Sequence, residues 1–483
     1  MSKKQPTLLE KLQFRGTWWL PERPDNKVFG QLTFDPDDGI LLEADGLLSS
    51  SDQAFGNVSF KPDIILGLSL EGKPCTLWRN FRQEIQLRSS GVHSQVFRYH
   101  FLFLGEQFAS SDDLLFRFVS VRFTNLEAWV GWKPFDDQIG DPRKNKPRSL
   151  TMRRLRKLRF PVPCIDASIS IAPHMTANQE FLSRQWTHFD VVRFTPKKRQ
   201  HIDWFFDVVH HFSNLLCLFT HQTLFQIRLV GCTRSERMKQ LGGKLIPNEI
   251  EIYGSQAHVA PVKQLAPPQI PFRFGHVRRQ FRKALQQWFS NRAKYDSVYD
   301  LYFFSFYNTK LGVEFQFLSL VQATEALHRA IRPGKYLPED KYQKYASVLA
   351  GALPKDTPPD LKAALKSRIK YGNEHSLRKR LLQMLGSLSA DARGLICADY
   401  KQFVNRVVDT RNYLTHYDKS LKAAALDMIG MLGACYRLRR LLTIFLLKDI
   451  GLAEGVVCDV ISSHKRFEIP ESVKGEAQQR HGP

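Results

Sequence analysis

The 483-residue sequence is poor in features that mark secreted, membrane and zinc-binding proteins. Its seven cysteines are scattered, odd in number and never spaced as CxxC, so neither a disulfide framework nor a zinc ribbon is indicated. The first residues include basic side chains but no apolar core, and we expect no signal peptide. The apolar stretch 421–452 is interrupted by Asp427, Arg437, Arg439 and Arg440, which favours a buried helix over a membrane span. These absences predict a cytoplasmic protein that does not cross a membrane.

The short motifs of nucleotide and metal chemistry are also missing. No glycine-rich loop of the Walker or Rossmann form is present, which argues against nucleotide hydrolysis and dinucleotide binding. Histidines and aspartates gather between residues 201 and 221, but neither HExxH nor facial-triad spacing occurs among them. We interpret them as packing or surface residues, and we predict neither a metal nor a cofactor.

Acidic residues are scarce relative to basic ones, since 47 Asp and Glu stand against 70 Lys and Arg, a net charge of +23. Residues 276–483 hold 34 of the basic and 20 of the acidic residues, hence +14, whereas residues 1–275 hold 36 and 27, hence +9. The shorter C-terminal part is the more cationic, as expected if it contacts nucleic acid. A generally basic protein with solvated Lys and Arg faces explains the charge equally well.

Hydrophobic periodicity divides the chain into a β-rich front and a helical back. In residues 1–255, short strand-like runs are separated by turn signals, and 35–39, with the sequence DPDDG, is a strong hairpin signal. A basic, proline-punctuated segment near 137–161 is predicted to join two lobes of this region. The predicted strands are 14–20, 28–34, 39–43, 96–103 and 114–123, and a helix is predicted near 201–219.

Proline marks the boundary between the two parts. Residues 256–274 include Pro261, Pro267, Pro268 and Pro271, and we interpret this segment as a linker because proline disfavours both helix and strand pairing. Beyond it, we predict a helical bundle at 275–465 and a polar tail at 466–483. The predicted helices are 275–293, 296–309, 312–332, 338–352, 359–370, 375–387, 399–418 and 420–449. The expected fold class is therefore α+β, with a β-rich N-terminal region followed by an all-α bundle.

The predicted helix at 399–418 carries the strongest catalytic candidate. Projected at about 100° per residue, it has an apolar arc that is expected to be buried and an opposite polar row in steps of three or four. The apolar arc comprises Tyr400, Phe403, Val407 and Leu414, and the polar row comprises Asn405, Asp409, Asn412 and His416. Arg411 is separate from the row, about 140° around the helix from His416, at the rim of the apolar arc.

Three of these side chains suit the cleavage of RNA without a metal. An imidazole such as that of His416 can take a proton from a ribose 2′-OH or give one to a leaving 5′-oxygen. The guanidinium of Arg411 offers fixed donors to phosphate oxygens as charge develops, and Asn412 can orient the imidazole or donate to the phosphate. The expected products are a 2′,3′-cyclic phosphate, or the 3′-phosphate from its opening, and a 5′-OH end.

One Arg and one His so far apart around a helix do not form a compact site by themselves. Packing this helix against its symmetry mate in an isologous dimer would bring two copies of Arg411 and of His416 into one cleft. We therefore predict a composite site in a homodimer or a higher homo-oligomer. As a bare pattern, Arg followed by His five positions later is common, and the structural alternative is an Arg and a His that decorate a core helix.

The hexapeptide 411–416, RNYLTH, late in a helical bundle resembles the R-(polar)-x3-H signature of HEPN-domain ribonucleases. That resemblance implies catalytic roles for Arg411, Asn412 and His416, and an earlier helix often supplies an acidic residue, for which Glu325 is the candidate. An ion pair between Glu325 and Arg329 is the alternative. The front of the chain, FRGTWWLP at 14–21 and FDPDDG at 34–39, resembles the opening of ApeA-type proteins, which are bacterial HEPN effectors of antiphage defence.

The resemblance implies abortive infection, in which a nuclease stays silent until a trigger derived from the phage appears, with the front half as the sensing or regulatory part. The RNA substrate could be tRNA. The main competing hypothesis is a non-catalytic module that binds nucleic acid or acts as a scaffold, with a purely structural hexapeptide. A sugar-binding front half is a third hypothesis. The basic runs 278–283, 378–380 and 437–440 are interpreted as solvated faces, or jointly as a groove for RNA phosphates.

Overall fold

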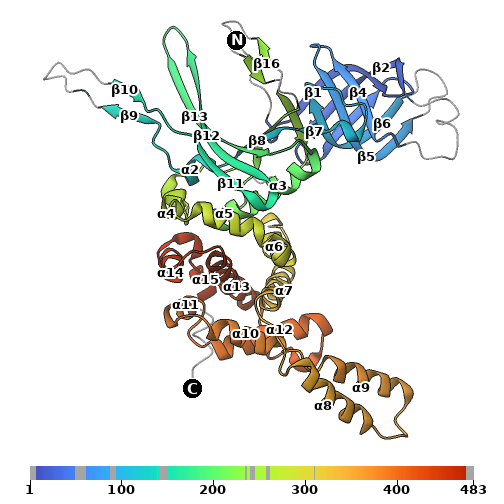
Figure 1. Ribbon diagram of the computed structural model, residues 1–483, viewed down its shortest axis with the longest axis vertical. Helices are drawn as coiled ribbons and strands as arrows, with labels where there is room; N and C mark the ends of the chain where they lie inside the picture. The colour runs from blue at the N-terminus through green and yellow to red at the C-terminus, as the bar shows by residue number, and fades with distance from the viewer. Residues whose placement is uncertain are drawn as a thin grey trace. The chain divides into compact units, whose positions relative to one another are not determined.

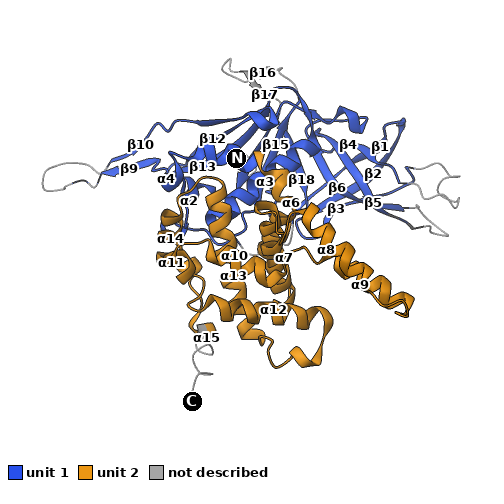
Figure 2. Cartoon of the chain, turned by 60° about the horizontal axis from the view of Figure 1, so that its bottom comes forward, with its two compact units in different colours: residues 1–289 blue, residues 290–483 orange. Residues whose placement is uncertain are grey.

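The computed structural model describes residues 7–48, 61–86, 94–138, 140, 149–233, 237–239, 245–247, 249–256, 262–308 and 310–474. The chain separates into two compact units, residues 1–289 and residues 290–483, which are coloured separately in Figure 2. The first unit is built largely from strands and the second from helices (Figure 1), so the predicted α+β class, with a β-rich region followed by a helical one, is confirmed.

Among the described residues, twelve strands of the first unit form one antiparallel sheet in the order β11-β12-β13-β8-β15-β18-β6-β3-β2-β1-β4-β5. Strand β5 also pairs with β6, so β1 to β6 close into a barrel and the other strands extend from it. The barrel strands are β1 (Leu12–Leu20), β2 (Arg23–Asp35), β3 (Gly39–Ala44), β4 (Ile64–Ser69), β5 (Pro74–Gln86) and β6 (Ser94–Leu104). The others are β8 (Phe118–Phe123), β11 (Leu158–Val162), β12 (Ala167–Gln179), β13 (Arg184–Pro196), β15 (Gln226–Cys232) and β18 (Ile250–Gly254).

A tryptophan fixes the packing at one end of the barrel. The Trp18 side chain is completely buried, and its indole N–H donates to the carbonyl oxygen of Gly30 at 3.4 Å. The ring lies against Gly67 so closely that a Cβ atom at this position would lie 2.4 Å from it. Only glycine therefore leaves room for the indole, and the tryptophan and the glycine depend on each other.

Two sequence predictions in this unit are confirmed and one is wrong in detail. Asp35 at the end of β2 pairs with Gly39 at the start of β3, and Gly39 has a φ of +85°, so 35–39 is the predicted hairpin turn. The predicted helix is α3 (Ile202–Thr220). The predicted strand 114–123 is divided, because β7 (Leu115–Phe116) pairs with β14 (Gln200–His201) before β8 begins.

The segments predicted as connections contain structure of their own. Within 137–161, β10 (Ser149–Met152) pairs with β9 (Phe135–Gln138), and residues 139 and 141–148 lie outside the described residues. Within 256–274, a 3-10 turn covers Pro267–Gln269, and the buried Trp129 donates its indole N–H to the carbonyl oxygen of Phe272 at 3.0 Å. Pro261 lies outside the described residues. The short strands β16 (Arg237–Lys239) and β17 (Leu245–Pro247) also pair in this unit.

Asp190 in β13 gives the first unit a pH-dependent stability. Its carboxyl group is fully buried, 3.1 Å from Nε2 of His188, and burial, followed by repulsion from Glu127, raises the pKa of Asp190 to about 8. Because the folded state holds this proton and the unfolded state releases it above about pH 4, the carboxyl group costs stability as the pH rises from about 4 to 8. We expect Asp190→Asn to be more stable than the wild type at pH 8, by on the order of 2 kcal/mol, and to lose this advantage toward pH 4. Thermal unfolding of both proteins across this range measures the difference, and an advantage that stays constant with pH would contradict the account.

Helices α4 (Phe274–Val277) and α5 (Phe281–Ser290) replace the single helix predicted at 275–293. The second unit contains α6 (Arg292–Tyr307), α7 (Val313–Ile331), α8 (Glu339–Gly351), α9 (Pro359–Tyr371), α10 (Leu377–Gly386), α11 (Ala390–Gly394), α12 (Tyr400–His416), α13 (Met428–Asp449), α14 (Glu454–Ser463) and α15 (Glu471–Lys474). Its core is built chiefly by α6, α7, α10, α12 and α13, and α13 contributes an almost continuous apolar interior.

Helix α13 starts later than the predicted helix at 420–449. The side chain of Asp427 accepts a hydrogen bond from the backbone N–H of Gly430 at 2.8 Å, which caps the helix at its observed first turn. Residues 419–421 form a separate 3-10 turn. In the predicted tail, the side chains of Phe467 and Val473 are buried, and residues 475–483 lie outside the described residues.

Candidate functional site

Helix α12 carries the hexapeptide 411–416 at its C-terminal end. It starts after Asp399, whose side chain accepts from the backbone N–H groups of Lys401 and Gln402 at 3.0 Å. It stops at His416 because Tyr417 adopts a left-handed conformation with a φ of 51°. The predicted helix is thus confirmed, and His416 is its last residue.

One face of α12 is anchored in the core of the second unit. Phe403 and Val407 are buried as predicted, whereas Tyr400 and Leu414 at the two ends of the predicted arc are only half-buried. Thr410 links the helix to the segment before α13, because its hydroxyl accepts a hydrogen bond from the backbone N–H of Leu426 at 2.8 Å. The fully buried residues therefore end at Thr410, directly before the hexapeptide, and the helix leaves the core at its C-terminal end.

The hexapeptide side chains differ in exposure. The side chain of His416 is exposed, and those of Arg411 and Asn412 are half-buried. The guanidinium Nη1 of Arg411 donates to Oδ1 of Asn412 at 3.1 Å, and the Thr415 hydroxyl donates to the carbonyl oxygen of Arg411 at 2.8 Å. Within residues 310–474, no hydrogen bond joins Asn412 to His416. The imidazole therefore faces solvent, while the guanidinium is held by its neighbour.

A carboxylate lies two residues beyond the imidazole. Hydrogen bonds from the side chain and the backbone N–H of Ser420 lower the pKa of Asp418, and the charge of His416 contributes to the same direction. Asp418 is thus ionised at neutral pH. An acidic side chain next to an exposed imidazole can hold a water or a ribose hydroxyl near it.

Helix α10 covers the polar row at its N-terminal end. The Nη2 atom of Arg378 lies 3.1 Å from Oδ1 of Asp409, and Nη1 of the same guanidinium donates to Oδ1 of Asn405. The sequence placed Asn405 and Asp409 in one row with Asn412 and His416. It gave no indication that Arg378 binds the first two of these side chains. Arg378 therefore holds the row at the end distant from His416.

The basic runs that were interpreted as solvated faces include cations with structural roles. Arg380 lies two positions after Arg378, and the exposed fraction of its side chain is only 2%. Arg440 donates to the carbonyl oxygens of Leu395 and Phe467, and Arg439 donates to Oε1 of Gln316 at 2.9 Å. The solvated-face interpretation is wrong for these residues, because the guanidinium groups satisfy polar atoms inside the second unit.

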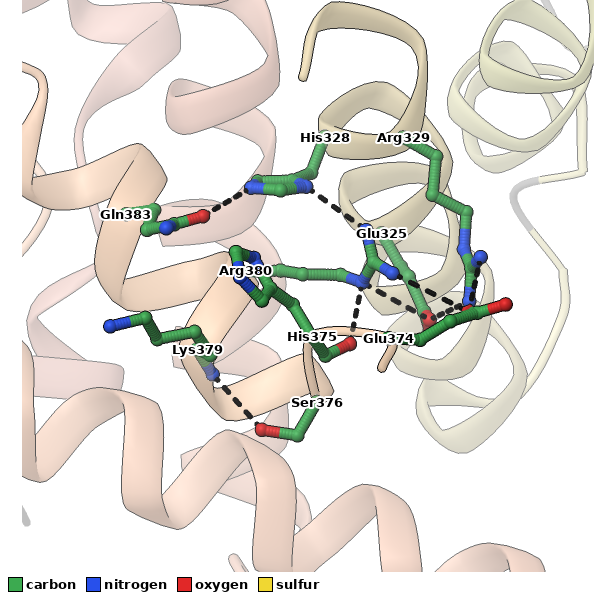
Figure 3. Close-up of polar contacts among 9 residues, drawn as sticks. All are labelled: Glu325, His328, Arg329, Glu374, His375, Ser376, Lys379, Arg380 and Gln383. Carbon is green, nitrogen blue, oxygen red and sulfur yellow. Dashed lines mark hydrogen bonds and ion pairs between the residues drawn. The ribbon is translucent and has the colours of Figure 1, made fainter. Parts of the chain in front are cut away.

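Glu325 in α7 belongs to another cluster, which is shown in Figure 3. Its Oε1 lies 3.2 Å from Nη2 of Arg329, which is the ion pair that the sequence offered as the alternative, and 3.9 Å from Nε of Arg380. Among residues 310–474, no hydrogen bond or ion pair joins Glu325 to Arg411 or His416. In this arrangement the carboxylate supports the α7–α10 interface.

Two family models match the chain. The model described as ApeA N-terminal domain 1 matches residues 13–288, which is more than half of the sequence. The chain belongs to the ApeA family. A second model, described as Apea-like HEPN, matches residues 318–456, which include most of α7 and all of α8 to α13. The resemblance to ApeA-type HEPN proteins is thereby confirmed, and the hexapeptide of this ApeA-family chain lies inside its HEPN match.

No curated protein and no solved structure matched this chain. Within the described ranges, none of the helices combines the length and the apolar character needed to span a bilayer.

Proposed function

We propose that this ApeA-family chain is a metal-independent endoribonuclease that acts in abortive-infection antiphage defence. The observation that carries the proposal is the position of His416, which is exposed at the end of a core-anchored helix inside the Apea-like HEPN match. A catalytic imidazole needs this combination, because the helix fixes its position while the solvent-facing ring remains accessible to RNA.

In the proposed reaction, one His416 imidazole removes the proton of a ribose 2′-OH, and the oxygen attacks the adjacent phosphorus. The bond from phosphorus to the 5′-oxygen breaks, and an imidazolium donates the proton that the leaving oxygen needs. Arg411 stabilises the charge on the phosphate oxygens, and Asn412 holds the guanidinium through the 3.1 Å hydrogen bond. The products are a 2′,3′-cyclic phosphate, or its opened 3′-phosphate, and a 5′-OH end.

We further propose that the site is completed by a second protomer, since Arg411 and His416 lie on different sides of α12 by the helical projection. An isologous pair of α12 helices places the His416 imidazole of each protomer beside the Arg411 guanidinium of the other, which gives two equivalent Arg–His pairs in one cleft. In each pair the imidazole first acts as the base, and the imidazolium that forms then acts as the acid. The partners of the chain are then an RNA substrate, such as tRNA, and at least one further copy of the chain.

We propose that residues 1–255 form a region that senses the trigger or regulates the nuclease, and that residues 256–274 link this region to the ribonuclease. Residues 275–465 then form the ribonuclease domain, and residues 466–483 form a polar tail. The family match supports a distinct front part, and it extends from residue 13 to residue 288, past the proposed linker. The resemblance to antiphage effectors supports a phage-derived trigger. An effector that destroys the RNA of an infected cell would act in the cytoplasm.

The proposal is tested by incubating the full-length protein with tRNA and with mixed cellular RNA in EDTA. We expect cleavage that leaves 2′,3′-cyclic phosphate or 3′-phosphate ends and that falls by at least about a hundredfold in His416→Ala. Lys401→Ala is the matched control, because Lys401 is an exposed cation on the same helix outside the hexapeptide. Binding of RNA without cleavage would support the non-catalytic module instead.

Because a defence nuclease can be silent until it is triggered, the same variants should also be tested in cells. We expect toxicity and RNA fragmentation on overexpression or after phage infection with the wild type and with Lys401→Ala, but not with His416→Ala. Surviving cells with intact RNA in both conditions would contradict the nuclease proposal.

A further inference from the structure

A helical hairpin, α8 and α9, extends from the other helices of the second unit, and no further helix of residues 310–474 packs along it. Figures 1 and 2 both show the two helices side by side and projecting from the other helices of that unit. Neither helix contains a buried residue. Large apolar side chains on it are nevertheless exposed, with fractions of 61% for Tyr345, 71% for Val348, 52% for Leu349 and 49% for Leu361. Exposed apolar side chains gathered in this way are typical of a surface that another molecule covers.

The exposed apolar residues lie beside the seam between the two helices. The half-buried residues Tyr342, Ala346 and Ala350 mark the seam on α8, and Leu365 and Ile369 mark it on α9. The Tyr342 hydroxyl donates to the carbonyl oxygen of Ile369 across this seam. In an antiparallel pair, the positions directly before the seam residues of both helices face the same side.

That side of the hairpin is apolar in its centre and cationic at its edges. It carries Tyr345 and Leu349 of α8 and Leu361 of α9, and Val348 lies at its outer edge. Of the cations, Lys341 and Arg368 lie on this side, and Lys344 lies at its outer edge. The acidic residues of α8, in contrast, are confined to its first turn. Within residues 310–474, none of these three cations forms an ion pair. We call this side of the hairpin the α8–α9 face.

The base of the hairpin is rigidly attached to the bundle. The side chain of Asn373 is buried, accepts from the backbone N–H of Leu337 at 2.9 Å and donates to its carbonyl oxygen at 3.0 Å. Just outside, the backbone N–H of His375 donates to the carbonyl oxygen of Gly334 at 2.7 Å. The two chain segments that enter and leave the hairpin are thus tied together, so the α8–α9 face is presented by a fixed support rather than by a loose loop.

We propose that the α8–α9 face binds an acidic amphipathic helix of another protein. Its apolar centre matches the apolar stripe of such a helix, and its cationic edges match acidic residues that flank the stripe. A second copy of the same face is a poor occupant, because it would bring Lys341, Lys344 and Arg368 toward cations of the same type. The binding site is independent of the catalytic hexapeptide, so it stands or falls separately from the proposed nuclease.

The test uses the full-length protein and two synthetic fluorescent peptides with the same leucine stripe, one flanked by glutamates and one flanked by lysines. We expect saturable binding of the acidic peptide, measured by fluorescence anisotropy, and at least about tenfold weaker binding of the basic one. Binding should weaken as salt screens the charges. The variant Val348→Glu/Leu349→Glu should lose at least about tenfold in affinity, because it places one charge in the apolar centre and one at its edge.

Ser347→Glu is the control for added charge, because it places one glutamate on the opposite flank of α8, where Ser347 is exposed. It should leave the affinity unchanged, and circular dichroism should show both variants folded. The proposal would be overturned if the two peptides bound equally well, or if binding of the acidic peptide did not saturate up to about 1 mM of protein. It would also be overturned if Val348→Glu/Leu349→Glu bound the acidic peptide with unchanged affinity. A change of oligomeric state in that variant, measured by analytical ultracentrifugation, would also overturn it in favour of a second copy.

Discussion

Mixing Arg411→Ala protomers with His416→Ala protomers is expected to restore RNA cleavage that neither variant supports alone. Each variant by itself should lose about 10²–10⁴-fold in cleavage rate, because one removes the charge stabilisation and the other removes the proton transfer. In a mixed dimer, one of the two sites combines the intact Arg411 of one protomer with the intact His416 of the other. After random exchange, about a quarter of the wild-type activity should return.

The physical basis is the geometry of α12. The side chains of Arg411 and His416 project to different sides of the helix, and His416 is the last helical residue. A single helix cannot bring both groups to one phosphate without a partner surface. Exchange of subunits under mild denaturation, followed by an assay of RNA ends in EDTA, measures the restoration.

The decisive control replaces one partner of the mixture. Mixing Arg411→Ala with the double variant Arg411→Ala/His416→Ala should restore nothing, because no protomer then supplies a guanidinium. If the first mixture also restores nothing while a monomeric form of the wild type cleaves RNA, the composite site is wrong. In that case the proposed nuclease activity could still be correct, since the monomer would retain it.

Local sequence patterns predicted the helix that carries the hexapeptide and the DPDDG turn, because both depend on neighbours along the chain. The apolar positions Phe403 and Val407 define one face of a helix by themselves, and a turn of this composition needs no distant contact. The same reasoning missed the division of the strand predicted at 114–123, because β7 pairs with β14, which is distant in the sequence. Tertiary pairing therefore decided what local propensity could not.

The cations around the candidate site were the least predictable feature. Three basic residues at 378–380 look like one solvated patch, yet Arg378 pairs with Asp409 on α12 and Arg380 is enclosed between α7 and the loop before α10. Only the packing of helices that are remote in the sequence determines which cation is covered. The one available signal is Gly334, since a glycine in the loop before the hairpin can mark a place where another group comes close to the backbone.

Loss of Arg380 should destabilise the second unit more than any other single cationic change in this cluster. Its Nε donates to the carbonyl oxygen of His375 at 2.9 Å, and its Nη1 lies 3.1 Å from Nδ1 of the buried His328 (Figure 3). Glu325 and Glu374 lie within 4 Å of the same guanidinium. Arg380→Met retains much of the volume but leaves the carbonyl oxygen of His375 and Nδ1 of His328 without this donor, and we expect a loss of about 3 kcal/mol in the free energy of unfolding.

Arg329→Met is the matched control, because Arg329 binds the same two carboxylates but its side chain is half exposed to water. It should cost no more than about 1 kcal/mol. Urea unfolding measures both losses, and hydrogen exchange should localise the larger one to α7 and α10. Equal losses in the two variants would show that burial of Arg380 is not the source of the stability.

Gly334 provides an independent test of the same packing. It has a φ of +65°, and a Cβ atom at this position would lie 2.4 Å from Nη1 of Arg380. Gly334→Ala should therefore cost about 2 kcal/mol in the wild type, of which about 1 kcal/mol comes from the backbone conformation alone. In the Arg380→Met background only the backbone part should remain, because the guanidinium that the methyl group would meet is gone. A cost of Gly334→Ala that is the same in both backgrounds would mean that the close approach of the loop to Arg380 does not constrain the glycine.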